Sequence, residues 1–365
     1  MGNGNLRNQI CWCGSKKKYK NCHLTKPEEE KPKIWEAEKL LKNSFSAKMC
    51  LVPQKLKSEC NEIIRAHSIF KSANLKTIAR DGHVYTMNPS MQGLQKSKGR
   101  LGIELVGINK ASTFTGFCKY HDKELYKEIE DEIIVPTLSQ LFLLSYRAVC
   151  REIFTKMSSL DVFDKAKMIK NNQIMNLIIK PIVLGTKAAI RDLEKIKNTY
   201  DSSLLNQNFF NYSYCYLLLD KPLPIVSSGA IFPHHDFKGN LLQDLGDIKV
   251  EADELAFNAV TLNNGGAMLI FGRKSMVATK FIKSFCEVDD SFKVSTFINF
   301  LFTHFENICV SPDWWDSLST TQRDKLLERY NSGVGPWNNQ TDNALFPDKI
   351  DNIDIKVVKI IQNVI

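Results

Sequence analysis

The sequence predicts an α+β fold, because its helical and strand-like segments are grouped along the chain and do not alternate. β-branched and aromatic residues in short runs, separated by Pro, Gly and Asn, indicate strands between residues 212 and 280. Apolar residues at helical spacing indicate helices before and after that region. Cys, His, Gly and Lys are dense in the first 25 residues, which indicates a small metal-organised knuckle ahead of the larger body.

The segments before residue 211 are mainly helical. Ile34 to Phe45 has apolar residues at helical spacing, and residues 122–205 follow the same pattern with an expected break at Pro181. Two short β-prone segments, His83 to Thr86 and Ile103 to Ile108, lie in the irregular stretch between these helices.

The segments after residue 211 are predicted to form a strand-rich body that ends in helices. The strand-like segments are Tyr214 to Leu219, Ile225 to Ser228, Ile248 to Glu251, Leu255 to Leu262 and Ala267 to Phe271. Helices are expected over Phe297 to Cys309 and Ser319 to Tyr330, and a capping box from Ser319 to Gln322 opens the second.

These patterns divide the chain into a short knuckle, a charged linker and three larger parts. The expected segments are 1–25 for the knuckle, 26–33 for the linker, 34–135 for a second zinc module with flanking helices, 136–210 for a helical core and 211–365 for the α+β body.

Length and composition favour a folded protein that does not span a membrane. The 365 residues are 43% apolar, which is enough for a full core and excludes a disordered tail. Apolar runs such as Leu141 to Leu144 and Tyr214 to Leu219 are far shorter than the roughly 18 to 20 residues of a membrane-spanning helix. Met1 to Arg7 has no hydrophobic signal region, so we expect a soluble, cytoplasmic protein.

The basic excess is concentrated at the N-terminus. The formal net charge is +9, and residues 1–33 hold eight Lys or Arg against three Glu. A basic segment favours nucleic acid or another anionic partner, because each neutralised phosphate releases counterions. The ten Cys residues are expected to be reduced thiols or metal ligands and not a disulfide framework.

Four metal ligands lie within thirteen residues at the N-terminus. Thiolate and imidazole groups in a set of four match a closed tetrahedral zinc site. Gly14 and Ser15 permit the tight turn that such a site requires. The ligands are Cys11, Cys13, Cys22 and His23.

This segment resembles the SEC-C motif, a zinc-binding module found at the C-terminus of the SecA translocation ATPase and on many other bacterial proteins. Lys18, Tyr19 and Lys20 match its basic-aromatic element, and Trp12 stands where the family usually has Pro. The resemblance implies zinc and a macromolecular contact surface. It does not extend to the SecA motor, because the chain contains no Gly-x-x-x-x-Gly-Lys-Ser/Thr loop.

A second set of Cys and His residues predicts another zinc site. Cys118 and His121 form a Cys-x-x-His pair directly before a helix-like run, and Cys60 with His67 supplies a remote pair. This is the layout of treble-clef zinc modules. The alternative is that these Cys and His side chains are ordinary core or surface groups.

The same region also resembles a divergent HNH-type nuclease segment. That resemblance implies that His67 acts as general base, that Asn109 orients it and that His121 binds the catalytic metal ion. The gap from His67 to Asn109 is long, and Ala66 stands where the family has an acidic or His residue.

Three functions are therefore open from the sequence. The first is a zinc-binding bacterial SEC-C-motif protein that contacts nucleic acid or a protein partner through its N-terminal module. The second is a metal-dependent nuclease in defence or mobile-element function, and the third is a protein-binding adaptor. The expected contact residues are Lys16, Lys17, Lys18, Tyr19 and Lys20.

Residues 200–365 carry no recognisable chemical motif. His234 and His235 follow Pro233 between strand-like segments, and we interpret them as part of a surface loop. Neither a nucleophile-elbow motif nor a dinucleotide-binding fingerprint occurs in the chain.

Overall fold

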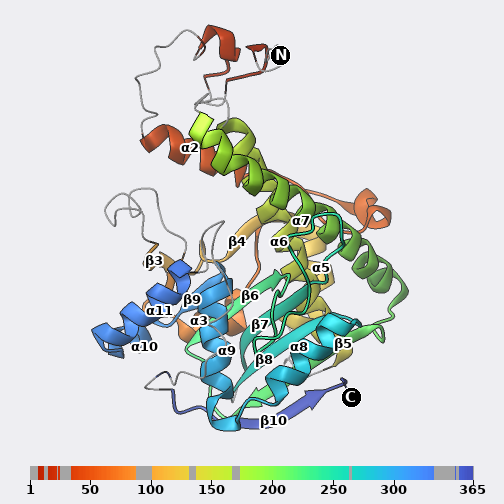
Figure 1. The fold of residues 1–365 in the computed structure, drawn as a ribbon, viewed down its shortest axis with the longest axis vertical. Helices are drawn as coiled ribbons and strands as arrows, with labels where there is room; N and C mark the ends of the chain where they lie inside the picture. The colour runs from red at the N-terminus through yellow and green to blue at the C-terminus, as the bar shows by residue number, and fades with distance from the viewer. Residues whose placement is uncertain are drawn as a thin grey trace.

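The structure is a computed structural model with an α+β fold, as the sequence predicts (Figure 1). The residues that it describes are 7–11, 15–22, 24, 34–87, 101–130, 137–166, 173–262, 265–332, 350 and 353–364.

An eight-stranded sheet forms the centre of the molecule, and each described strand pair in it is antiparallel. Its strand order is β10-β5-β8-β7-β6-β9-β2-β3. The strands are β2 (His83–Thr86), β3 (Glu104–Gly107), β5 (Tyr212–Leu219), β6 (Ile225–Ile231), β7 (Leu255–Leu262), β8 (Gly265–Arg273), β9 (Ile308–Val310) and β10 (Val357–Gln362).

Helices cover both faces of this sheet, because its central strands are apolar on both sides. Successive residues of β7 alternate between two cores: Phe257 packs with α8 (Met276–Cys286) and α9 (Asp290–His304), and Ala256 packs with α6 (Leu138–Ala166) and α7 (Gln173–Asn206). The two helical layers and the sheet between them are visible in Figure 1.

Further short elements surround the three layers. The helices are α2 (Ile34–Ser44), α3 (Lys76–Ile78), α5 (Lys119–Glu130), α10 (Pro312–Ser317) and α11 (Thr320–Ser332), with helical turns η1 (Tyr19–Asn21), η2 (Gln54–Glu59) and η3 (Lys71–Leu75). A separate two-stranded antiparallel sheet joins β1 (Ile63–His67) to β4 (Thr113–Cys118).

Three expected elements differ from the observed ones. Ile248–Glu251 is not a strand, because the side chains of Asp244 and Asp247 accept backbone amide hydrogen bonds there and stabilise turns. The helix expected over 297–309 ends at His304 and is followed by β9, whereas α7 continues through Pro181 without the expected break.

The capping interaction at α11 agrees with the sequence, since the Gln322 amide donates to Ser319 Oγ at 3.2 Å. The central sheet joins two of the segments expected from the sequence: β2 and β3 come from residues 34–135, and the other six strands come from residues 211–365. The domain boundaries themselves stay a prediction.

Candidate metal centre

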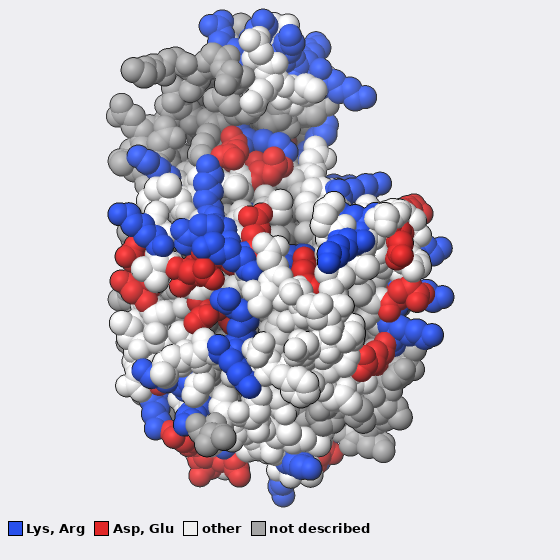
Figure 2. All heavy atoms as spheres, turned by 90° about the vertical axis from the view of Figure 1, so that its right-hand side faces the viewer, with Lys and Arg blue, Asp and Glu red and all other residues white. Residues whose placement is uncertain are grey.

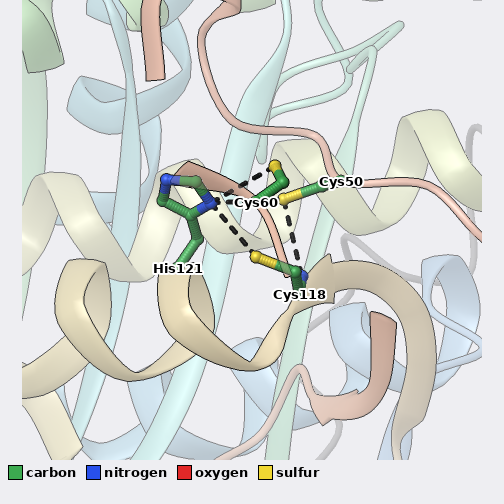
Figure 3. Close-up of side chains that lie close together, drawn as sticks. All are labelled: Cys50, Cys60, Cys118 and His121. Atoms are coloured by element: carbon green, nitrogen blue, oxygen red, sulfur yellow. Dashed lines mark hydrogen bonds between the residues drawn. The ribbon is translucent and has the colours of Figure 1, made fainter. Parts of the chain in front are cut away.

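Three cysteines and one histidine converge beside the two-stranded sheet. The Sγ atoms of Cys50, Cys60 and Cys118 and one ring nitrogen of His121 all lie within 4.8 Å of one another. His121 Nδ1 is 3.7 Å from Cys50 Sγ, 3.5 Å from Cys60 Sγ and 3.1 Å from Cys118 Sγ. Figure 3 shows the three thiols and the imidazole directed toward a common point. Among the described residues, this is the one group of at least three His, Cys, Asp or Glu side chains close enough to hold a metal ion.

The spacing of these atoms matches a tetrahedral metal site. A zinc ion about 2.3 Å from sulfur and about 2.0 Å from nitrogen places a sulfur and a nitrogen about 3.5 Å apart. The three measured sulfur–nitrogen distances, 3.1, 3.5 and 3.7 Å, lie around that value. Only small shifts of the side chains would therefore be needed to bind an ion.

Two of the ligands come from the start of α5. Cys118 ends β4 and directly precedes the helix, and His121 lies in its first turn, three residues later. Residues three apart share one face of a helix, so both side chains reach the same point. The positive end of the helix dipole also favours a thiolate at Cys118.

Cys50 reaches the centre because residues 47–51 run alongside β4. The Met49 amide donates to the Thr115 carbonyl at 3.2 Å, and the Leu51 amide donates to the Gly116 carbonyl at 2.9 Å. The Cys118 amide in turn donates to Cys50 Sγ at 3.4 Å. Backbone pairing therefore fixes the position of a cysteine that lies 68 residues away in sequence.

Cys60 follows η2, and hydrogen bonds fasten the residues after it to α5. The Lys119 amide donates to the Glu62 carbonyl at 2.9 Å, and the Tyr120 amide donates to Asn61 Oδ1 at 3.0 Å. Amides at the start of a helix lack partners inside the helix, so these bonds satisfy them and hold Cys60 near Cys118.

The crowded thiols differ in how readily they ionise. Burial raises the pKa of Cys60 to about 12, with Cys50 and Cys118 adding to the shift, and burial also raises the pKa of Cys50. Burial acts to raise the pKa of Cys118 too, but hydrogen bonds from the His121 and Asn61 backbone lower it below its ordinary value. Cys118 therefore loses its proton more readily than Cys50 and Cys60, and ionisation of several thiols at once needs a positive charge in the centre.

His121 is suited to act as a neutral ligand. Burial lowers its pKa, so the imidazole is uncharged near pH 7. Its second ring nitrogen, Nε2, lies 4.0 Å from a carboxylate oxygen of Glu59. Metal-binding histidines commonly direct the ring nitrogen that does not bind metal toward a carboxylate, which orients the ring.

A buried ion cluster holds α5 against α6 behind the centre. Arg147 is fully buried and donates to Asp122 at 3.0 Å and to Glu130 at 2.7 Å, both on α5. Its guanidinium also lies 3.6 Å from the centroid of the Tyr126 ring. These contacts fix the helix that supplies Cys118 and His121.

The cluster differs in one member from the set expected from sequence: Cys50 is present and His67 is not. Cys118 pairs with Ile63 in the two-stranded sheet, whereas His67 pairs with Thr113 at the other end. Four residues of strand separate the two positions by about 13 Å. His67 Nε2 lies instead 2.9 Å from the Ile108 carbonyl oxygen.

The same geometry bears on the HNH-type resemblance. His121 lies in the cysteine cluster, and His67 lies at the far end of β1, so the two are not brought to one reacting centre. Asn109 is exposed in the turn before β4. Nothing in the arrangement of these three residues supports a nuclease site.

Cys50 was missed because it has no ligand nearby in sequence. A usable signal existed, since a cysteine ten residues before Cys60 completes a Cys₃His set with Cys118 and His121. Three Cys and one His form a common structural zinc set.

The N-terminal segment forms a compact turn around two of its expected ligands. Ile10 and Lys18 form an antiparallel bridge, and the Cys11 amide donates to the Lys17 carbonyl at 2.7 Å. Cys11 is buried, and Cys22 Sγ lies 3.1 Å from Ser15 Oγ. The other two expected ligands, Cys13 and His23, lie outside the described residues.

Comparison with known proteins identifies one family match. The SEC-C motif matches residues 7–25, which contain all four expected N-terminal ligands. No curated protein and no solved structure matches the chain. In the part of the chain that the structure describes, no helix is long and apolar enough to cross a membrane.

Proposed function

We propose that this protein is a zinc protein with two structural metal sites, the Cys50–Cys60–Cys118–His121 centre and the SEC-C motif, and that the SEC-C module contacts nucleic acid. The observation that carries the proposal is the convergence of four side chains from three separate segments on one point. Buried thiols and an imidazole in a set of four suit zinc better than magnesium or calcium, which prefer oxygen ligands.

A structural role for zinc follows from the closed ligand set. Catalytic zinc sites keep one coordination position for water or substrate, whereas four protein ligands complete a tetrahedron. The two-stranded sheet followed by α5, with two ligands at the start of the helix, has the layout of a treble-clef module. In this role the ion would fasten residues 47–51, η2 and α5 to one another.

The SEC-C segment fits a second zinc ion. Its four ligands have the same chemistry as the first centre, three Cys and one His. The turn between Ile10 and Lys18 buries Cys11, and Ser15 Oγ lies beside Cys22 Sγ, where a hydroxyl can stabilise a thiolate. Reduced thiols are needed at both sites, which favours the cytoplasm.

The basic residues of this module support a nucleic-acid contact. Lys16, Lys17 and Lys18 are exposed on the turn, and Lys20 and Tyr19 are half-buried beside them. Figure 2 shows Lys and Arg side chains gathered at the end of the molecule that carries this segment. A metal-held turn presents its charges to phosphates at a lower ordering cost than a free tail.

Metal content per chain tests the two zinc sites. We expect two zinc ions in the full chain, and one ion after either Cys118→Ser or Cys13→Ser. Cys286→Ser is the matched control, because this cysteine lies at the end of α8 outside both sites, and it should retain both ions. His67→Gln should also retain both. One zinc ion or none in the unaltered chain would contradict the proposal.

Fluorescence anisotropy with labelled DNA and RNA tests the contact. The double variant Lys16→Glu/Lys17→Glu should weaken binding more than about tenfold, and the affinity of the unaltered chain should fall steeply with salt. The control is Lys280→Glu/Lys283→Glu, which reverses two exposed lysines on α8. Equal losses in both variants would contradict a specific contact, and no binding at low salt would favour a protein partner.

A further inference from the structure

A cavity of about 340 Å³ lies between α6, the end of β6 and the end of α9. None of its lining residues belongs to the metal centre. Its wall combines apolar and aromatic side chains with a smaller number of charged and histidine groups, which is typical of a small-molecule site.

The cavity exists because the central sheet is interrupted beside β6. β9 is short and pairs with β6 only from Ile225 to Ser227, so residues 228–231 have no strand neighbour on that side among the described residues. Gly229 also lacks a side chain, and a Cβ there would lie 2.3 Å from the Phe305 ring. The strand end and the end of α9 therefore enclose a space that α6 covers.

One face of α6 supplies the charges. Arg151, Thr155 and Lys156 line the cavity, and Lys156 forms an ion pair with Glu152 at 3.2 Å. Arg151 forms no hydrogen bond or ion pair with any described residue. The guanidinium is half-buried at the cavity wall without a bonded anion, so it is available to accept one.

The electrostatics of Arg151 agree with this arrangement. Burial lowers its pKa, and the carboxylates of Glu152 and Glu306 raise it by less. Glu306 is exposed at the cavity, whereas Glu152 is already neutralised by Lys156. The nearby carboxylates therefore compensate the positive charge of Arg151 only in part.

Histidines complete the polar lining. His304 packs against the Phe300 ring with centroids 4.4 Å apart, and burial lowers its pKa to about 4, so near pH 7 it is a neutral donor. His235 Nδ1 is buried without a hydrogen-bond partner among the described residues. Phe232, Pro233 and Leu245 provide apolar surface beside these groups.

We propose that this cavity binds a small organic anion, whose carboxylate or phosphate group is bound by Arg151 with His304 and His235 as further hydrogen-bonding groups, and whose remainder packs on Phe232 and Phe300. The volume is near the lower end of the roughly 300 to 1,000 Å³ found for ligand pockets, which suits a metabolite-sized molecule. The site is independent of the two zinc sites.

Ligand-observed NMR titration of the zinc-loaded full chain tests the proposal. The probes are AMP and benzoate, with adenosine and benzamide as neutral counterparts. We expect saturable binding of at least one anion with a Kd below about 1 mM, and at least about tenfold weaker binding of its neutral counterpart. Binding of AMP but not benzoate would identify the phosphate, and the reverse would identify the carboxylate.

Two variants change the cavity in different ways. Arg151→Gln removes the charge, and Thr155→Phe fills the space while leaving Arg151 in place; each should weaken binding at least about tenfold. The control is Arg80→Gln, which removes an exposed arginine outside the cavity and should leave the Kd unchanged. Absence of saturation by either anion up to about 10 mM, or binding that persists unchanged in both cavity variants, would overturn the proposal.

Discussion

The two candidate metal sites differ in how far apart their ligands lie along the chain. The SEC-C ligands fall within Cys11 to His23, whereas the ligands of the central site extend from Cys50 to His121, which are 71 residues apart. A local site can order only its own turn, because it joins no distant segments. A nonlocal site closes long loops and packs against the core, so its metal should contribute to the stability of the whole body.

The largest expected effect comes from removing one ligand of each site. Cys118→Ser should lower the free energy of unfolding by at least about 5 kcal/mol, because metal affinity at a structural site is also folding free energy. Cys22→Ser should change the unfolding of the body by less than about 0.5 kcal/mol. Urea denaturation followed by far-UV circular dichroism measures both, and equal effects would remove the distinction between the two sites.

Breaking the ion cluster around Arg147, which holds α5 against α6, should lower the free energy of unfolding nearly as much. Arg147→Leu leaves Asp122 and Glu130 without their buried partner, which should cost about 3 to 5 kcal/mol of unfolding free energy. The variant should also release zinc from the central site more readily, as judged by the rate of transfer to a chelator. A loss of stability without a change in the rate of zinc transfer would show that the ion cluster does not stabilise the metal centre.

Unfolding measured at a series of pH values tests a group outside both metal sites, Glu254, which directly precedes β7. Glu254 is buried, its carboxylate oxygens have no hydrogen-bond partner among the described residues, and burial raises its pKa to about 8. Because the folded pKa lies above the unfolded one, the stabilising effect of the protonated group is present at low pH and is lost as pH rises to about 8.

Glu254→Gln should remove this dependence. Between about pH 6 and pH 8.5 the unaltered chain should lose about 2 to 3 kcal/mol of unfolding free energy, and the variant should lose much less. Urea denaturation at fixed zinc concentration measures the difference. The same slope in both proteins would mean that another group titrates.

The smallest expected effect is at the two exposed ion pairs that join Arg80 to α10. Arg80 near β2 binds Asp313 at 3.2 Å and Asp316 at 2.6 Å, both on α10. Exposed pairs contribute little, so Arg80→Gln should shift the melting temperature by no more than about 2 °C. A larger shift in differential scanning calorimetry would show that this contact stabilises the packing of the two segments.

The sequence was informative where the determinants are local. The SEC-C motif was recognisable because its four expected ligands lie within thirteen residues of sequence. The Cys118–His121 pair was recognisable because it lies directly before a helix-like run. Cys50 was missed although it completes a Cys₃His set, because its approach to Cys118 depends on backbone pairing between residues 47–51 and β4. His67 was assigned to the wrong group of neighbours for the same reason, since its distance from Cys118 depends on strand register.

The same contrast applies to the body. Runs of β-prone residues predict β5 to β8 well, because nearly all residues of these strands are buried on both faces of the sheet. The cavity was not predictable, since its walls come from α6, β6 and α9, which meet only in the folded chain. His234 and His235, expected in a surface loop, are half-buried and line this cavity.

The most direct test of the account is zinc K-edge X-ray absorption on the Cys13→Ser variant, in which only the central site should hold zinc. We expect one zinc ion per chain with about three sulfur ligands near 2.3 Å and about one nitrogen ligand near 2.0 Å. Loss of one sulfur in the additional variant Cys50→Ser would place that residue in the coordination shell. A shell of oxygen and nitrogen alone, or a variant without zinc, would contradict a Cys50–Cys60–Cys118–His121 zinc centre.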